Sequence, residues 1–192
     1  MKRCSVLLLM SLALACSQEK QAAEEETKAG TLVQVENVRW RVPATWVTET
    51  PSSGFRKGQY RLPRAEGDPE DATCVVFYFR GEGGAVQANL ERWSGQFEQP
   101  DGRPSREVAK IERTEVNGLK QTRMDLTGTY LFSPTPMMPP TERKPGFRLL
   151  AAVIETSTGP WFVKLVGPEK TVAKWEGSFF ELLESFGERA SQ

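Results

Sequence analysis

The 192-residue chain carries 25 Lys and Arg residues against 25 Asp and Glu residues, and it contains no histidine. The lack of histidine excludes Ser-His-Asp and Cys-His catalysis and any metal site built on imidazole. The balanced charge leaves no broad basic surface of the kind that binds nucleic acid. We therefore expect a protein that is not an enzyme, that has no catalytic residues, metal site or cofactor, and that does not bind nucleic acid.

The first 15 residues have the pattern of a secretory signal peptide. Lys2 and Arg3 precede an apolar run at residues 6–15, which ends in small residues. That run is shorter than the roughly 20 apolar residues that a membrane-spanning helix needs. We therefore expect residues 1–15 to direct export and then to be removed.

Cys16 follows this run directly, and the segment Ala13-Leu14-Ala15-Cys16 resembles the lipobox of bacterial lipoproteins. It departs from the usual pattern at Ala13, where leucine is common. The resemblance implies that Cys16 becomes the first residue of the mature chain and carries a diacylglycerol thioether and an acyl chain such as palmitate. Several acyl chains are enough for stable anchoring in a membrane. The alternative is an ordinary signal peptide followed by an unrelated cysteine.

Ser17 bears on which membrane would hold the anchor. In lipoproteins of Gram-negative bacteria an aspartate at this position favours the inner membrane, whereas this chain has serine. For a Gram-negative source the resemblance therefore implies the outer membrane, with the protein facing the periplasm. Loss of the signal peptide leaves 23 basic against 25 acidic residues, and Cys74 as the only cysteine besides Cys16. No intrachain disulfide is then expected, although the compartment is oxidising.

The composition divides the mature chain into three parts. Residues 16–30 comprise the lipidated cysteine and a polar, flexible tether, which would reach roughly 45–50 Å at full extension. Residues 31–187 have the mixed composition of a single globular domain, large enough to bury a core of its own. Residues 188–192 form a short C-terminal tail.

Strand patterns dominate the domain. They lie at residues 38–42, 55–62, 73–79, 109–116, 119–130, 147–154 and 161–166. Asn117-Gly118 is a strong hairpin signal between two of them. The strands at 73–79, 147–154 and 161–166 are apolar on both faces, which indicates that both faces of the sheet are covered. The more polar strand at 55–62 suits a sheet edge.

Two segments have the apolar stripe of an amphipathic helix, residues 85–97 and 168–186. Pro168 suits a first helical position, and Gly187 suits a C-terminal cap. Strands interrupted by single helices are typical of the α+β class. We therefore expect an α/β/α sandwich, in which a mainly antiparallel, twisted sheet carries one helix on each face.

The segment Trp40-Arg41-Val42-Pro43, followed by Trp46, resembles the opening strand and turn of the PsbP-like superfamily. The late strand pair and the closing helix are similar to that fold as well, so the resemblance covers most of the domain. This superfamily includes photosystem II extrinsic proteins and a nuclear import factor that binds a small GTPase. The chain resembles uncharacterised bacterial lipoproteins with such a domain still more. The resemblance implies binding roles and transfers no catalytic residue.

Two sets of residues are candidates for a binding surface. Trp46 follows a proline turn and Trp161 opens a strand, so either could lie at a rim and contact a ligand or partner. The second set is the segment at residues 132–147, in which five prolines disfavour strand pairing and methionines offer adaptable contacts. Its candidate contact residues are Pro134, Pro136, Met137, Met138 and Arg143. A long loop of this kind is either functional or a mobile excursion.

Three other features have structural interpretations that we prefer. Cys74 lies within an apolar strand, where a buried and inert thiol is the expected state. The glycines at 81, 83 and 84 could hold an anion before a helix, but a tight strand-to-helix turn explains them without a ligand. The acidic segment at residues 66–71 lacks the ligand spacing of a calcium loop and is expected to be a solvated turn.

The sequence thus favours a lipid-anchored protein of the bacterial envelope that acts as a non-enzymatic binding or accessory module. Its expected partners are the membrane, through Cys16, and an envelope protein, through the loop at 132–147. The alternative is a protein that binds a small hydrophobic or anionic compound in a crevice between sheet and helix. A hydrolase that relies on carboxylates alone is a more remote possibility.

Overall fold

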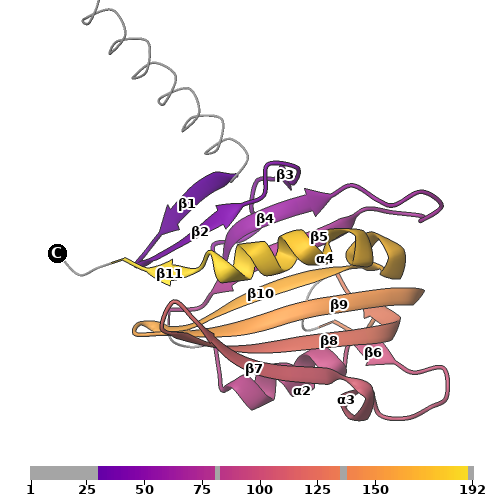
Figure 1. Cartoon of the computed structure of the whole chain (residues 1–192). Helices are drawn as coiled ribbons and strands as arrows, with labels where there is room; N and C mark the ends of the chain where they lie inside the picture. Colours follow the sequence, from indigo (N-terminus) through magenta and orange to yellow (C-terminus); the bar gives the residue numbers. More distant parts are fainter. Residues whose placement is uncertain (1–29, 81–82, 135–137, 190–192) are drawn as a thin grey trace, which may run out of the picture.

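In the computed structural model, residues 30–80, 83–134 and 138–189 are described, and they form an α+β domain (Figure 1). The main sheet has eight strands, paired in the order β3-β4-β5-β10-β9-β8-β6, and β7 pairs with β8 as well. These strands are β3 (Val47–Thr48), β4 (Arg56–Leu62), β5 (Ala72–Tyr78), β6 (Phe97–Glu98), β7 (Lys110–Val116), β8 (Leu119–Phe132), β9 (Glu142–Thr156) and β10 (Gly159–Pro168). All of their pairings are antiparallel, as the sequence predicts.

A second layer covers one face of the main sheet. It consists of helix α4 (Glu169–Glu184) and a three-stranded sheet of β1 (Thr31–Val35), β2 (Val38–Val42) and β11 (Gly187–Glu188). Alternate residues of β10 and β9, such as Val163 and Ile154, meet Phe179 and Leu183 of α4 in a fully buried cluster. This face therefore carries a small sheet beside its helix, which the prediction of one helix per face did not include.

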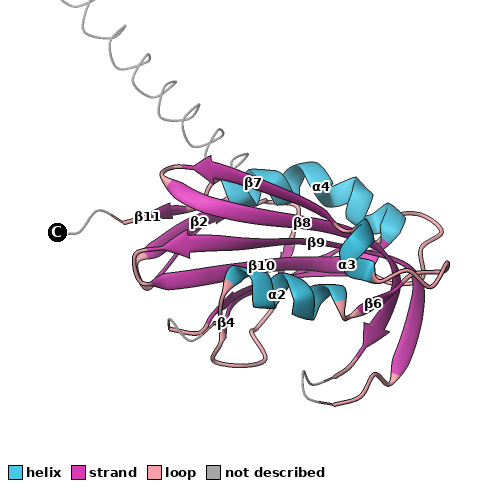
Figure 2. Cartoon of the chain, turned by 90° about the horizontal axis from the view of Figure 1, so that it is seen from below, coloured by secondary structure: helices cyan, strands magenta, loops and turns pink. Residues whose placement is uncertain are grey.

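The opposite face packs against α2 (Val86–Ser94) and the short helix α3 (Ser105–Val108), as Figure 2 shows from below. Leu90 and Trp93 of α2 contact the other set of alternate residues, including Val153 and Phe162. The strands in the middle of the sheet are thus apolar on both faces because each face is covered. The predicted helix at 85–97 is shorter in the structure, and α3 has no sequence prediction.

Two hairpins shape the sheet. Asn117 and Gly118 both adopt positive φ, 53° and 76°, as the predicted two-residue turn between β7 and β8 requires. The second hairpin joins β8 and β9 and contains a register shift, because Gly128 pairs with Phe147 whereas Tyr130 pairs with Lys144. We call the part of this hairpin beyond the shift, residues 129–144, the arm.

The arm corrects the prediction that prolines keep residues 132–147 out of the sheet. Arg143 pairs with Leu131 in the ladder, so the loop itself is only residues 133–141. Pro145 fits because it lies at the register shift, where a missing N–H donor costs no ladder hydrogen bond. Gly128 lies opposite, and a Cβ atom there would come within 2.7 Å of the Glu98 carbonyl oxygen.

Three further differences concern strand and helix ends. Gly187 does not cap α4, whose C-cap is Ser185, but begins β11 beside β2. The strand predicted at 55–62 is not quite an edge, because β3 pairs with its last residues. Four strands have no sequence prediction, namely β1, β3, β6 and β11, and three of them are two residues long.

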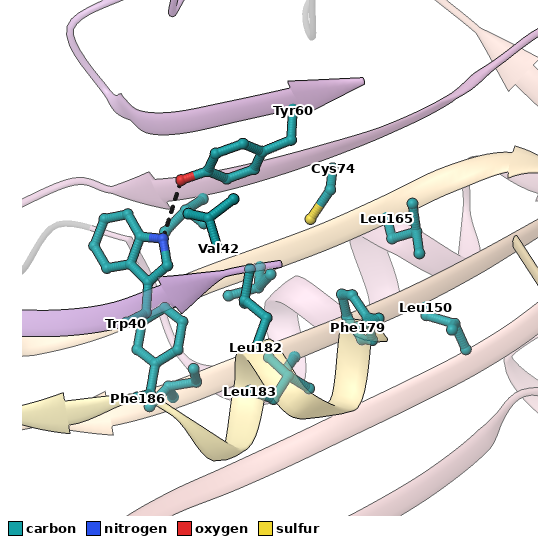
Figure 3. Close-up of a cluster of buried hydrophobic side chains, with 14 of the residues drawn as sticks. Trp40, Val42, Tyr60, Cys74, Leu150, Leu165, Phe179, Leu182, Leu183 and Phe186 are labelled. Atoms are coloured by element: carbon teal, nitrogen blue, oxygen red, sulfur yellow. Dashed lines mark hydrogen bonds between the residues drawn. The ribbon is translucent and has the colours of Figure 1, made fainter. Parts of the chain in front are cut away.

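The indole of Trp40 on β2 joins the two layers (Figure 3). It stacks on Phe186 with ring centroids 5.4 Å apart and lies 5.8 Å from the ring of Trp161. Its Nε1–H donates a 3.0 Å hydrogen bond to the hydroxyl of Tyr60 on β4, and all four side chains are buried. Burial raises the pKa of Tyr60 to about 12, so its hydroxyl stays neutral at physiological pH.

Tyr60→Phe is expected to lower the free energy of unfolding by about 1–3 kcal/mol, because it leaves the buried indole N–H of Trp40 without an acceptor. Tyr78→Phe is the matched control, since the Tyr78 hydroxyl donates to the carbonyl of Thr158 in an exposed turn, where water can replace it. Urea denaturation of both variants measures the difference. Equal losses would contradict the role assigned to the Trp40–Tyr60 bond.

Candidate binding surface

The structure corrects the predicted positions of the two tryptophan candidates. Trp46 is 5% exposed, lies against Tyr60, and donates its indole N–H to Ser178 of α4. Trp161 is fully buried and stacks on Tyr78 with ring centroids 4.5 Å apart. Its indole nitrogen is buried and has no partner among the described side chains. Neither tryptophan lies at a rim, because both belong to the core beneath α4.

The candidates on the arm are accessible where the structure describes them. Pro134 is exposed, and 55% of Met138 is exposed, which is unusual for a large apolar side chain. Arg143, the second residue of β9, is exposed. Pro136 and Met137 fall outside the described residues.

The base of the arm is held on both sides. On one side Arg143 makes a two-fold ion pair with Glu98 of β6. On the other side Lys144 donates 2.8 and 2.9 Å hydrogen bonds to the carboxylate of Glu70, in the turn between β4 and β5. The arm therefore presents its tip from a braced base.

Aromatic rings pack against one another at this base. Tyr130 lies 5.2 Å from Phe97, 5.9 Å from Phe147 and 6.4 Å from Phe132, measured between ring centroids. The backbone N–H of Leu131 donates to the carbonyl of Gln96, just after α2. These contacts bring the arm against the end of α2, on the face of the sheet opposite α4.

A lysine lies beside these rings, in a position that the sequence analysis did not predict. Lys164, on the α2 face of β10, is half-buried, donates to the side-chain oxygen of Gln96, and lies 5.5 Å above the ring of Tyr130. The charges of Arg92 on α2 and Arg56 on β4 both act on Lys164. With burial as the larger cause, they lower the pKa of Lys164 to about 7.

No protein-family model matches the chain, and none of the curated proteins matches it either. Several solved structures do match the chain. The solution structure of cyanobacterial PsbP (CyanoP) from Synechocystis sp. PCC 6803 aligns with 83% of this chain and 92% of its own, with a TM-score of 0.50 and 10% identity. The fold is PsbP-like. A protein of unknown function from Pseudomonas aeruginosa aligns with 84% of this chain and 98% of its own, with a TM-score of 0.49 and 15% identity.

At these identities the likeness describes the fold alone, and the cavities of the PsbP-like domain depend on its own residues. A cavity of about 250 Å³ lies between α4 and β7–β8, lined in part by Phe179, Phe180 and Met124. It corresponds to the crevice between sheet and helix that the alternative function requires. A more open cleft of about 540 Å³ lies between the start of α2 and the turn of β7 and β8.

The glycines before α2 serve packing in this PsbP-like domain. A Cβ atom on Gly83 would come within 2.3 Å of the ring of Phe162, and Gly84 has a positive φ of 77°. The side chain of Asn89 also donates to the carbonyl of Gly83, so this oxygen is already bonded. The turn is therefore explained without a bound anion, while Gly81 falls outside the described residues.

The acidic turn at residues 66–71 contacts the start of α4 as well as solvent. Asp68 accepts hydrogen bonds from the backbone N–H and hydroxyl of Thr171, at 2.8 and 2.6 Å, and thus caps α4. Asp71 pairs with Arg61 at 2.8 Å, a bond that lowers the pKa of its carboxyl. No group of three potential metal ligands occurs in residues 30–80, 83–134 and 138–189.

Cys74 is fully buried on β5 and is not bonded to another cysteine. Burial in apolar surroundings raises the pKa of its thiol far above the ordinary value. The thiolate that a nucleophile needs is therefore disfavoured, as the sequence predicts for this strand.

Replacing Lys164 with methionine is expected to remove a pH dependence of stability. The pKa of Lys164 is about 7 in the folded protein and 10.5 ordinarily, so between these values the unfolded chain keeps a proton that the folded one loses. Stability of the wild type therefore rises with pH across this range, and below pH 7 the cost of the charge is fully present. The stability advantage of Lys164→Met should be largest near about pH 6 and shrink toward about pH 10.

Urea denaturation at several pH values measures this difference between variant and wild type. Lys170→Gln, an exposed substitution on α4 that removes the same charge, is the control and should follow the wild type. The charged and titratable groups that act with Lys164 are Arg56, Arg92 and Tyr130, and all three remain in both variants. A pH-independent difference would show that Lys164 does not titrate in this range.

Proposed function

We propose that the chain is a lipid-anchored protein of the bacterial cell envelope whose PsbP-like domain binds a protein partner through the tip of the arm. Cys16 would hold the acyl chains, and the polar segment up to Gly30 would tether the domain. Ser17 favours the outer membrane, with the domain in the periplasm. The role is that of a binding or accessory module without catalysis of its own.

The arm tip is the observation that carries this proposal. It exposes Pro134 and Met138 on a base that the pairs Arg143–Glu98 and Lys144–Glu70 brace. A braced base lowers the entropy that is lost on binding, and methionine adapts its shape to a partner.

The place where the tether would join the domain supports the same assignment. Gly30 precedes β1 on the α4 side of the domain, whereas the arm lies on the opposite side, by β6 and α2 (Figures 1 and 2). Attachment at Gly30 would therefore leave the arm clear of the point where the tether joins the domain. In the described parts of the chain, no helix has the length and apolar character needed to cross a membrane.

Cys16→Ser is expected to release the protein from membranes, because the thiol that would carry the lipid is lost. Fractionation of cells should find the wild type in the membrane pellet and the variant in the soluble fraction. Mass spectrometry of the mature N-terminus provides the second measurement, since the acyl chains add a defined mass to Cys16. An unchanged distribution between the fractions would refute the anchor.

Met138→Ser is expected to weaken capture of the partner about fivefold or more, as truncation of an interface anchor costs about 1 kcal/mol or more. Capture is measured by pull-down from native membranes, with quantification of the proteins that the wild type enriches. Met138 is exposed, so its substitution should leave stability within about 0.5 kcal/mol.

Ile111→Ser is the matched control for this experiment. Ile111 is also an exposed apolar residue, but it lies on the edge strand β7, away from the arm. Loss of capture in Met138→Ser alone supports the arm as the contact surface. An equal effect of both substitutions, or of neither, would remove the arm from the proposal.

A further inference from the structure

The cavity of about 250 Å³ between α4 and β7–β8 joins an apolar wall to charged side chains. Its lining includes Phe179, Phe180 and Leu150 on the apolar side, and Arg123 on the charged side. We propose that this cavity binds a small compound with an apolar body and one carboxylate, and that Arg123 recognises the carboxylate. Such a ligand is additional to the protein partner proposed for the arm.

The apolar wall of the cavity comes from α4 and β9. Phe179 of α4 and Leu150 of β9 are almost completely buried and belong to the core cluster beneath α4 (Figure 3). Phe180 is half-buried, and its ring centroid lies 5.8 Å from that of Phe179. Sites for small molecules are lined mainly by such apolar and aromatic side chains, with a few placed polar groups. The wall therefore suits the apolar body of a ligand, which would leave water on binding.

Arg123 on β8 is held beside this wall by neutral groups. Its guanidinium carbon lies 5.2 Å from the centre of the Phe180 ring. Its Nε and Nη2 atoms donate hydrogen bonds of 3.1 and 2.9 Å to the side-chain oxygen of Gln121. Gln121 is buried, and its own amide nitrogen donates at 2.9 Å to the carbonyl of Leu183 on α4. A fixed amide thus orients the guanidinium without neutralising its charge.

The carboxylates around the cavity do not neutralise Arg123. Asp125 and Glu176 bind Arg148 instead, at 2.8 and 2.9 Å. Glu112 lies directly opposite Arg123 in the β7–β8 ladder, where opposite charges ordinarily pair, but it is exposed and its charge is solvated. Among the described residues, no carboxylate oxygen comes within 4 Å of the Arg123 guanidinium.

The remaining edge of the guanidinium matches one carboxylate. A guanidinium is a planar fork, and a carboxylate can accept two parallel hydrogen bonds from one of its edges. Gln121 takes the edge formed by Nε and Nη2. In the ranges that the structure describes, Nη1 donates to no protein oxygen, so the edge formed by Nη1 and Nη2 is the one that a ligand would contact.

The charges near the cavity favour a single carboxylate over a multiply charged anion. Together with Arg148, the charged residues that line the cavity are three cations and three carboxylates. The cavity therefore lacks the excess of positive charge that concentrates polyanions. One oriented guanidinium beside apolar rings is instead complementary to a compound that carries one negative charge at the end of an apolar body.

Arg41 of β2 shows that a missing counter-ion alone does not define a site. It is half-buried and also has no carboxylate within 4 Å among the described residues. It lines neither this cavity nor the open cleft beside α2. Arg123 differs because it shares a cavity with aromatic rings and because a buried amide fixes its guanidinium.

Titrations of the full chain carrying Cys16→Ser with phenylacetate and with octanoate, monitored by two-dimensional NMR, test the site. The corresponding alcohols, phenylethanol and octanol, have the same apolar bodies without the charge. At least one acid is expected to bind tenfold or more tightly than its alcohol, because hydrogen bonds to charged groups are the stronger ones. The residues that respond should include Arg123, Gln121 and Phe180.

Arg123→Met keeps an apolar stem but removes the guanidinium, so it should weaken binding of the acid tenfold or more and leave binding of the alcohol unchanged. Lys110→Gln removes an exposed cation of the cavity and should weaken binding of the acid by a smaller factor, about twofold to fivefold. Arg41→Met is the matched control and should bind like the parent chain.

A stronger response to phenylacetate would identify an aromatic acid as the ligand, and a stronger response to octanoate would identify a fatty acid. Equal binding of acids and alcohols, or binding of neither acid, would overturn the site. So would an unchanged affinity of Arg123→Met, or equal losses in Arg123→Met and Arg41→Met. The comparison of acid with alcohol needs no variant, so the test holds even if Arg123→Met should not fold.

The cavity is independent of the lipid anchor and of the arm tip. Cys16→Ser is common to all the chains compared, and Met138 is unchanged in them. The substitutions that test the proposed function leave Arg123, Gln121 and Phe180 unchanged. The two proposals can therefore fail separately.

Discussion

The contacts of the Trp40 indole hold the two layers of the domain together. One strand of the small sheet, β11, is only two residues long, and so small a sheet gains stability by packing against a helix or a second layer. Trp40 gives it a partner by stacking on Phe186 at the end of α4 and by bonding Tyr60 of the main sheet. The closing helix, the small sheet and the main sheet therefore form one core, and the other face is free to carry the arm.

The sequence predicts the central part of this fold well. Residues 73–79, 147–154 and 161–166 are apolar on both faces, and Asn117-Gly118 defines a turn, so local pattern determines these elements. The strands β3, β6 and β11 are different, since two-residue strands exist only because a partner strand passes beside them. The same holds for Gly187, whose role depends on β2 and not on the helix before it.

The binding surface is harder to predict because it depends on which faces the fold covers. Trp46 and Trp161 are amphipathic residues near turns, but the second layer buries both. The sequence does single out Lys164, because it is the one charged residue in the apolar strand 161–166. Its position beside Tyr130 and Gln96 could not be predicted, because those residues approach Lys164 only after strand pairing and helix packing.

The register shift at Gly128 and Pro145 makes the length of the arm independent of the strand alignment in the rest of the sheet. Pro145 has no partner in the ladder, and a Cβ atom on Gly128 would come within 2.7 Å of a carbonyl oxygen, so these two residues mark where regular pairing ends. Insertions or deletions beyond that point change the reach of the hairpin but not the alignment of the strands that build the core. Related domains could thus diverge in length and composition there while keeping one scaffold, and a designer could exchange the tip as a cassette.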